Sequence, residues 1–308
     1  MSEPDSSAEM SVDRPLAPGL YLVGTPIGNL EDITLRALRV LRSVDRIACE
    51  DTRQTQKLLN HYGIATPTVS CHQHNERERA TQFLADFAAG RRIALVSDAG
   101  MPGISDPGGW LARTAIEAGV AVYPIPGANA AVSALVASGL STAEFQFLGF
   151  LPEKAGARRT ALEGLALTPS GDTARTLIFY EAPHRILETL ADLESVWGPG
   201  LRVVVARELT KMHEEFLRGT VLEVRNNLAA RDRVRGEITL LVEAVPLAAE
   251  KQSASVAARV RQMEAEGIDE KEALKLLARE LGQSKSDLYR ELQRERAKRG
   301  SSAGKSRG

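Results

Sequence analysis

Cysteine is scarce in this chain, and long apolar runs are missing. The 308 residues include two cysteines, Cys49 and Cys71, which are too few for a disulfide framework and typical of a reducing compartment. No apolar stretch approaches the roughly 18 to 20 residues that a membrane span requires. The first residues, MSEPDSSAEMSVDRP, lack the apolar core of a secretory signal. We therefore expect a cytoplasmic protein without a membrane span.

The short signatures of nucleotide and phosphate binding are missing as well. Neither G-x-G-x-x-G nor G-x-x-x-x-G-K-[ST] occurs. A Gly-rich loop is nevertheless present in the segment LVSDAGMPGISDPGG, residues 95–109, behind an apolar run. No Lys or Arg lies between Ile93 and Leu111, so an anion would find no cationic side chain there. The loop favours a neutral or cationic ligand such as a nucleoside. Asp98 is placed to accept hydrogen bonds from a ribose or an ammonium group.

A full set of metal ligands is also lacking. Cys71, His72 and His74 lie close together in CHQHNERER, but a structural zinc site needs four ligands at suitable spacing, and no second pair follows. We expect no metal, and the segment favours substrate contact by His72, His74 or Asn75 instead.

Charge of either sign is nearly balanced, but it is unevenly distributed. The residues from Lys251 onward carry 14 basic and 9 acidic side chains, whereas the first 250 carry 25 and 31. A basic C-terminal part on an acidic body indicates a polyanionic partner. A basic tail that only improves solubility would give the same pattern, so both interpretations remain open here.

What the sequence does contain is a regular alternation of apolar runs and amphipathic segments. The spacing of Ile33, Leu35, Leu38 and Leu41, for example, is that of a helix with one apolar face. The predicted order is strand 19–24, helix 31–45, strand 46–51, a helix from Thr52, helix 75–90, strand 91–100, helix 108–119 and strand 120–127. Strands that alternate with helices in this way predict an α/β fold with a parallel sheet.

After Pro126 the pattern changes to a mixed α/β arrangement and then to helices. A small-residue helix at 128–139 precedes extended segments at 144–152, 176–185 and 201–211, and an antiparallel finish at 215–228 and 236–244. Three helical stretches then follow, with breaks at Gly267 and Gly282, and such short Gly-containing turns suit a helix-turn-helix. The predicted organisation is a disordered tail at 1–18, an α/β domain with a parallel sheet at 19–125, a mixed α/β domain at 126–246, a helical module at 250–298 and a flexible tail at 299–308.

Polar clusters follow six of the predicted strands. They read VGTPIGN, CEDTR, SDAGMPG, PIPGANA, FYEAPHR and ARELTK. Tight turns need Gly and Pro in any case, which would explain a single cluster. Six together indicate a ligand site, because ligands of parallel α/β sheets bind outside the carboxyl ends of the strands.

These clusters, in this order, resemble the tetrapyrrole methylase superfamily, and within it a branch that methylates ribosomal RNA. The resemblance rests on LYLVGTPIGNLEDITLRAL, CEDTR, SDAGMPGISDPG, PGANA, FLGFLP, YEAPHR and ARELTKMHEE, and it spans about residues 19–293. The first loop of the superfamily commonly reads G-x-G-P-G-D, whereas this chain has Gly24-Thr-Pro-Ile-Gly-Asn29. That departure fits the RNA branch and argues against a porphyrin-like substrate.

The resemblance implies two α/β domains with S-adenosylmethionine in the cleft between them, and a small helical C-terminal module. It further implies a homodimer that methylates the ribose 2′-oxygen of a cytidine in the decoding region of 16S rRNA, within the 30S subunit. The cofactor contacts that it implies are Pro26, Ile27, Ser97, Asp98, Ala99, Gly103, Asn129, Ala130, Tyr180, Glu181 and Leu209.

Methyl transfer to a hydroxyl needs orientation and a group that eases the proton away. Among the charged residues at the strand ends, Lys211, Glu181 and Asp51 are the predicted catalytic residues. Lys211 would stabilise the developing alkoxide, or act as the base if burial lowers its pKa. The predicted substrate contacts are Arg53, His184, Arg185, Arg207 and Glu208. Interlocking salt bridges are the alternative explanation for these Glu and Arg residues.

The basic C-terminal module is predicted to dock RNA through Lys271, Lys275, Lys285, Arg290 and the run from Arg294 to Arg299. Binding should then weaken steeply with salt. A solvated helical face is the alternative, because acidic residues are interleaved. For the whole chain, two further hypotheses stay open: a methyltransferase acting on a small tetrapyrrole, and an RNA-binding assembly factor without enzymatic activity.

Overall fold

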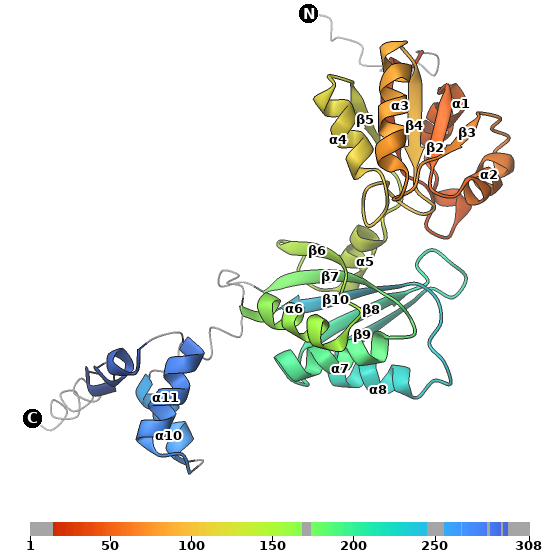
Figure 1. Ribbon diagram of the computed structural model, residues 1–308. Helices are drawn as coiled ribbons and strands as arrows, with labels where there is room; N and C mark the ends of the chain where they lie inside the picture. The colour runs from red at the N-terminus through yellow and green to blue at the C-terminus, as the bar shows by residue number, and fades with distance from the viewer. Residues whose placement is uncertain are drawn as a thin grey trace, which may run out of the picture. The chain divides into compact units, whose positions relative to one another are not determined.

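The computed structural model describes residues 15–167, 174–244, 256–265, 267–281, 284–290 and 292–294. One compact unit includes the described residues up to Leu162 together with 174–244, and it holds two five-stranded sheets (Figure 1). A second unit contains the C-terminal helices. The predicted α/β fold with two sheet-containing parts and C-terminal helices is confirmed.

The first sheet is entirely parallel. Its strands are β1 (Gly19–Val23), β2 (Arg46–Cys49), β3 (Thr68–Ser70), β4 (Arg92–Val96) and β5 (Val122–Ile125), and their order across the sheet is β3-β2-β4-β1-β5. The sequence pattern did not predict β3, because three half-buried residues are too few to show a period. All five carboxyl ends lie at one edge, so the polar residues that follow the strands are brought together there.

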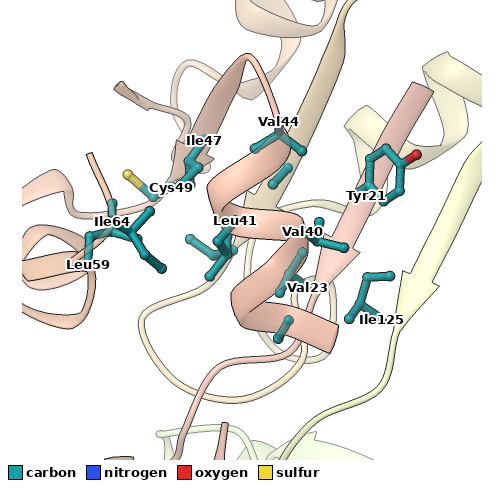
Figure 2. Packing of buried hydrophobic residues seen from close by; sticks show 13 residues of the cluster. Tyr21, Val23, Val40, Leu41, Val44, Ile47, Cys49, Leu59, Ile64 and Ile125 are labelled. Atoms are coloured by element: carbon teal, nitrogen blue, oxygen red, sulfur yellow. The ribbon is translucent and has the colours of Figure 1, made fainter. Parts of the chain in front are cut away.

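Four helices cover the two faces of this sheet. Helices α1 (Leu35–Ser43) and α2 (Thr52–His61) contribute to one buried cluster, and α3 (Glu76–Ala88) and α4 (Gly109–Glu117) contribute to the other. In Figure 2, Val40 and Leu41 of α1 lie among the buried residues of the strands. Successive strand residues alternate between clusters, as with Ile47 in the first and Ala48 in the second.

The second sheet is mixed. It consists of β6 (Phe145–Phe150), β7 (Arg175–Glu181), β10 (Ile238–Ala244), β8 (Arg202–Arg207) and β9 (Glu215–Thr220), in that order across the sheet. Only β6 and β7 are parallel neighbours, and the remaining pairs are antiparallel. The pairing of β6 with β7 is interrupted between Phe147 and Gly149, where the register shifts.

The helices of the second sheet are α5 (Ala130–Ser138), α6 (Ala155–Leu167), α7 (Ile186–Trp197) and α8 (Val221–Ala229). The first of them confirms the small-residue helix predicted at 128–139, whereas the sequence pattern did not predict the other three. The expectation of a continuous antiparallel finish at 215–228 is wrong beyond Thr220. The Thr220 hydroxyl accepts from the backbone N–H of Glu223, whose carboxylate accepts from the Thr220 N–H, so a capping box starts a helix there.

A buried ion cluster links α6 to α7. Arg158 and Asp192 have side chains only 1% and 4% exposed, and Nε of Arg158 donates to Oδ2 of Asp192 at 2.7 Å. Arg159 donates to the other oxygen of Asp192 at 2.6 Å. Because both oxygens of the buried carboxylate are used, the cluster fixes how the two helices meet.

The C-terminal unit has its own small apolar core. Helices α10 (Val256–Ala265) and α11 (Glu270–Leu281) and the helical residues 284–294 that are described contribute Val260, Leu274, Leu277, Leu288 and Leu292. Gly267 separates the first two helices, whereas the predicted break at Gly282 lies outside the described residues. The predicted tails at 1–14 and 299–308 also lie outside them. Leu16, within the predicted N-terminal tail, packs against the cluster of Figure 2.

Replacing Asp45 by asparagine should destabilise the protein more at neutral pH than in acid. The hydrogen bond from Arg92, opposed by burial, lowers the pKa of Asp45 to about 2. Because the folded-state pKa lies below the unfolded value, the stabilisation is complete above about pH 4 and is lost as the pH falls toward 2. We expect the variant's free energy of unfolding to be lower than that of the wild type by about 1 kcal/mol at pH 7, since the pair is partly screened by solvent. Urea unfolding of both proteins at pH 7 and pH 3 measures it; a difference that is equal at both values would contradict the ion pair.

Candidate active site

Two loops at the carboxyl ends of the first sheet are joined by backbone hydrogen bonds. The Thr25 N–H donates to the Gly100 carbonyl at 2.9 Å, and the Gly100 N–H donates to the Thr25 carbonyl at 3.1 Å. The Thr25 hydroxyl is 3.2 Å from the carbonyl oxygen of Ser97. The first loop, residues 24–29, and the Gly-rich loop, residues 97–109, therefore form one continuous wall.

Gly24 and Gly127 add the loop after β5 to this wall. A Cβ at Gly24 would lie 2.8 Å from the Cα of Gly127, and a Cβ at Gly127 would lie 2.8 Å from the Cα of Gly24. Side chains are excluded on both sides, because real Cβ atoms do not approach other atoms so closely. The crossing sets the position of Asn129, whose side chain accepts from the Val132 N–H at 3.1 Å and begins α5.

A cavity of about 390 Å³ lies at these loops and is lined by residues from both sheets. This size is in the range of small-molecule sites, and most of the lining is apolar, with a few polar groups that can orient a ligand. The lining residues are Ile27, Ala99, Gly100, Met101, Ile104, Ser105, Asp106, Asn129, Ala130, Phe150, Tyr180, Glu181, Ala182, Pro183, Leu209, Glu237, Ile238 and Thr239.

The predicted cofactor contacts divide into two groups. Seven line the cavity: Ile27, Ala99, Asn129, Ala130, Tyr180, Glu181 and Leu209. Pro26, Ser97, Asp98 and Gly103 do not line it, but they belong to the loops that form the wall. Asp98 accepts from the backbone N–H of Asp51 at 3.2 Å, which ties the Gly-rich loop to the end of β2.

Lys211 lies outside the cavity lining, in a network of carboxylates. Its ammonium donates to Glu208 at 2.9 Å and to Glu237 at 2.6 Å, and its side chain lies against Gly28 of the first loop. Burial lowers the pKa of Lys211, but the two carboxylates outweigh burial and raise it. Lys211 is thus kept as an ammonium, which suits charge stabilisation and not proton abstraction.

Glu181 lines the cavity, but its carboxylate is fully engaged beneath the surface. The side chain is 0% exposed and is paired with Arg185. It also accepts from the Thr189 hydroxyl and from the Ala182 N–H, each at 2.7 Å. Arg185 further donates to the Leu151 carbonyl at 3.0 Å. This arrangement matches the salt-bridge interpretation of the sequence.

Asp51 and Arg53 form an exposed pair at the start of α2. Asp51 caps the helix by accepting from the Arg53 N–H at 2.8 Å, and its other oxygen accepts from the Arg53 guanidinium at 3.0 Å. The hydrogen bonds from Arg53 lower the pKa of Asp51. The Arg53 side chain is 88% exposed. Neither residue lines the cavity.

The remaining predicted substrate contacts also lie outside the lining. Arg207 donates to Glu215 at 3.1 Å and to the Arg235 carbonyl at 3.1 Å, and His184 is exposed. Glu208 accepts from the Glu237 N–H at 3.0 Å, and its φ of 54° is strained for a residue with a Cβ. The structure therefore brings the predicted catalytic and substrate residues to the surroundings of the cavity and not to its wall, with Glu181 as the exception.

Several lining residues were not singled out from the sequence. Asp106 is the most notable, because its carboxyl has no ion-pair partner among the described residues. The signal was present, since SDAGMPGISDPGG contains two aspartates, but periodicity does not tell which one faces a cavity. Burial, reinforced by Glu50 and Asp98 and opposed by a hydrogen bond with Ser97, raises the pKa of Asp106 to about 6.

The Cys-His segment does not assemble into a metal site in the part of the chain that the structure describes. No group of three His, Cys, Asp or Glu side chains there is placed to hold a metal ion. Cys71 is buried, and burial raises the pKa of its thiol to about 12, whereas the rings of His72 and His74 lie edge to face at 6.0 Å. Among the described helices, none has both the length and the apolar character needed to cross a membrane.

Comparison with known proteins agrees with this fold. The family model described as Tetrapyrrole (Corrin/Porphyrin) Methylases matches residues 19–225. A solved structure of uroporphyrin-III-C-methyltransferase from Thermus thermophilus aligns with a TM-score of 0.52 and 21% identity, over 76% of this chain and 98% of that chain. Another structure of the Thermus thermophilus enzyme, complexed with S-adenyl homocysteine, aligns with a TM-score of 0.50 and 20% identity, over 73% and 98%. The chain belongs to the tetrapyrrole methylase family, as its sequence motifs indicated.

Within that family, full-length relatives give a finer assignment. Ribosomal RNA small subunit methyltransferase I of Halalkalibacterium halodurans is 51% identical over 275 residues, 88% of this chain and 93% of the relative. The protein of that name from Haemophilus influenzae is 45% identical over 272 residues, 88% of this chain and 94% of the relative. The chain belongs to the ribosomal RNA small subunit methyltransferase I family. The predicted methyltransferase activity, with S-adenosylmethionine as donor, is thereby confirmed.

Proposed function

We propose that this chain transfers a methyl group from S-adenosylmethionine to the ribose 2′-oxygen of a cytidine in the decoding region of 16S rRNA. The observation that carries the proposal is the mainly apolar cavity at the carboxyl ends of the first sheet, in a chain 45–51% identical to small-subunit rRNA methyltransferases over 88% of its length. Similarity to these relatives supports an RNA substrate, and the ribose oxygen as methyl acceptor is our proposal.

The cavity fits the cofactor in chemistry as well as in size. Its apolar side chains suit an adenine ring, and Asn129 and Thr239 offer polar groups for the ribose and the amino acid part. We propose that Pro26, Ser97, Asp98 and Gly103 support the cofactor from the surrounding loops. When bound, the cofactor supplies an electrophilic methyl group, and the chain's contribution is to orient the hydroxyl and to remove its proton.

Substrate RNA is proposed to contact the charged rim of the cavity. Arg53, with its exposed guanidinium, supports phosphate binding at the start of α2, and Lys211 is held as an ammonium in reach of the first loop. The proposed set of substrate contacts is completed by Arg207, His184, Arg185 and Glu208. Arg185 acts indirectly, because its ion pair holds Glu181 in place. The planar guanidinium suits phosphate better than an ammonium does.

The C-terminal helices are proposed to dock on RNA as a separate unit. Lys271, Lys275, Arg290 and Arg294 are exposed there and Lys285 is half-buried, whereas the positions from 295 to 299 lie outside the described residues. Lys275 and Arg290 pair with Glu272 and Asp287 at 3.2 and 3.4 Å, so part of the charge is already balanced. We also propose that the protein works as a homodimer, and in the cytoplasm, where ribosomal subunits are assembled.

Purified protein and labelled S-adenosylmethionine should label 30S subunits from a strain that lacks the enzyme. We expect the label on one cytidine ribose of 16S rRNA, identified by nuclease digestion and mass spectrometry. The control is 30S subunits from the parent strain, which should take up no label because the position is already methylated.

Two outcomes would contradict the proposal. Label on a base, or no label on either kind of subunit, would exclude ribose methylation. Transfer to a tetrapyrrole such as uroporphyrinogen would favour the small-molecule hypothesis, and tight RNA binding without transfer would favour an assembly factor.

A further inference from the structure

Three of the residues that line the cavity carry carboxyl groups, and they differ in their partners. Glu181 is buried against Arg185, and Glu237 accepts from the Lys211 ammonium at 2.6 Å. Asp106 forms no ion pair with any residue that the structure describes. Asp106 is therefore the carboxyl group of the cavity wall that is left available for a ligand.

The backbone next to Asp106 has an unusual conformation, to which residues associated with both sheets contribute. Ser105 has a φ of 60°, a left-handed conformation that costs energy for a residue with a side chain. Facing it, Gly149 of β6 lies at the register shift with a φ of 65°, and a Cβ there would come within 3.2 Å of the Ser105 Oγ. The irregularity of β6 thus makes room for the strained turn that directs Asp106 toward the cavity.

Among the described residues, the charged groups that act most strongly on Asp106 are acidic, and they are Glu50 at the end of β2 and Asp98 in the same loop. Burial, reinforced by the charge of Asp106, raises the pKa of Tyr180 of β7. His72 counteracts the rise in the pKa of Glu50, which burial and Asp98 cause. Burial and the two acidic neighbours raise the pKa of Asp106 to about 6, so at neutral pH it is ionised but accepts a proton more readily than an exposed aspartate.

We propose that the Asp106 carboxylate is the catalytic base that takes the proton from the substrate hydroxyl. In this step the hydroxyl oxygen forms a bond to the methyl carbon while the carbon–sulfur bond breaks. The electron pair of that bond stays on sulfur, which loses its positive charge, and the hydroxyl proton passes to Asp106. The inference rests on the proposed function, since it needs a hydroxyl nucleophile in the cavity.

Neither Lys211 nor Asp51 fits the role of the base as well as Asp106 does. Lys211 is kept protonated by Glu208 and Glu237, so it has no lone pair to offer. Asp51 is bound by Arg53, outside the lining, and hydrogen bonds hold its pKa low. Both residues remain in the proposed set as charge stabilisers and substrate contacts, whereas proton removal falls to Asp106.

Replacing Asp106 by asparagine tests the inference. Single-turnover methylation of 30S subunits should slow by roughly 10²- to 10⁴-fold, while the affinity for S-adenosylhomocysteine, measured by calorimetry, should change by less than about threefold, a small step on the affinity scale. The wild-type rate should fall tenfold per unit below about pH 6, where Asp106 becomes protonated, and the variant should lack this slope. The matched control is Asp232→Asn, an exposed aspartate that does not line the cavity, which should keep the wild-type rate.

Other results would overturn the inference. A wild-type rate in the Asp106 variant would exclude a base, and a loss of S-adenosylhomocysteine affinity equal to the loss of rate would make Asp106 a cofactor contact. A readout without substrate separates this inference from the proposed function. In protein loaded with S-adenosylhomocysteine, the carboxyl carbon resonance of Asp106 is identified as the one that is missing from the asparagine variant. This resonance should titrate near pH 6, and titration below pH 4 would overturn the base assignment. Wild-type protein that leaves the 30S ribose unlabelled would overturn the proposed function instead.

Discussion

Replacing Glu181 by glutamine is expected to cost about 3–5 kcal/mol of the free energy of unfolding. The substitution keeps the shape of the side chain but leaves the charge of Arg185 buried, with 9% of that side chain exposed. It also disturbs the hydrogen bonds from Thr189 and the Ala182 N–H. Urea unfolding at neutral pH, followed by circular dichroism, measures the loss.

Glu243→Gln is the matched control for this prediction. Glu243 lies on β10, the neighbour of β7 in the same sheet. Its Oε1 is 3.4 Å from Nη1 of Arg202, whose side chain is 61% exposed. We expect a change below about 1 kcal/mol there, because exposed pairs contribute little. Replacing both Glu181 and Arg185 by methionine should recover part of the stability, since no charge is then left unpaired. A Glu181→Gln protein as stable as the wild type would mean that the carboxylate is not the partner of Arg185.

The second large effect is expected at the crossing of Gly24 and Gly127. Gly127→Ala places a Cβ 2.8 Å from the Gly24 Cα and 2.9 Å from its carbonyl oxygen, so the two loops must separate. Overpacking of this kind costs about 1–3 kcal/mol, and because the loops form the cavity wall, we expect the cost as a loss of roughly 5- to 150-fold in affinity for S-adenosylhomocysteine.

Calorimetry of Gly127→Ala against Gly156→Ala separates the crossing from a general effect of alanine. Gly156 lies in α6, with nothing within 4 Å of the added Cβ and no positive φ. Its replacement should leave the affinity unchanged and stabilise the helix by about 0.5–1 kcal/mol. Equal affinities for the two variants would show that the loops tolerate separation.

The sequence by itself determined the class of fold, the place of the ligand site and the family. Alternating apolar and amphipathic segments are local patterns, so strands such as β1 and helices such as α3 follow from neighbouring residues alone. Clusters after six predicted strands indicated a ligand site. Four of them follow strands of the parallel sheet, whose carboxyl ends must meet at one edge. Seven of the residues implied by the family resemblance line the observed cavity.

Short or context-dependent elements were beyond this kind of reasoning. The strand β3 has three residues, and α8 begins in a segment whose apolar residues suit a strand equally well. There the reciprocal hydrogen bonds of Thr220 and Glu223 decide for a helix.

Only the tertiary structure decided what each charged residue does. Glu181 ends β7, Lys211 follows β8 and Asp106 lies in the Gly-rich loop after β4, and nothing local reveals the role of each. Packing places Arg185 beneath Glu181 and two carboxylates around Lys211, whereas Asp106 in the cavity wall has no ion-pair partner in the described part of the chain. The proton affinity of a side chain depends on burial and on charges contributed by segments far away in the chain, and these are set only when the two sheets have folded.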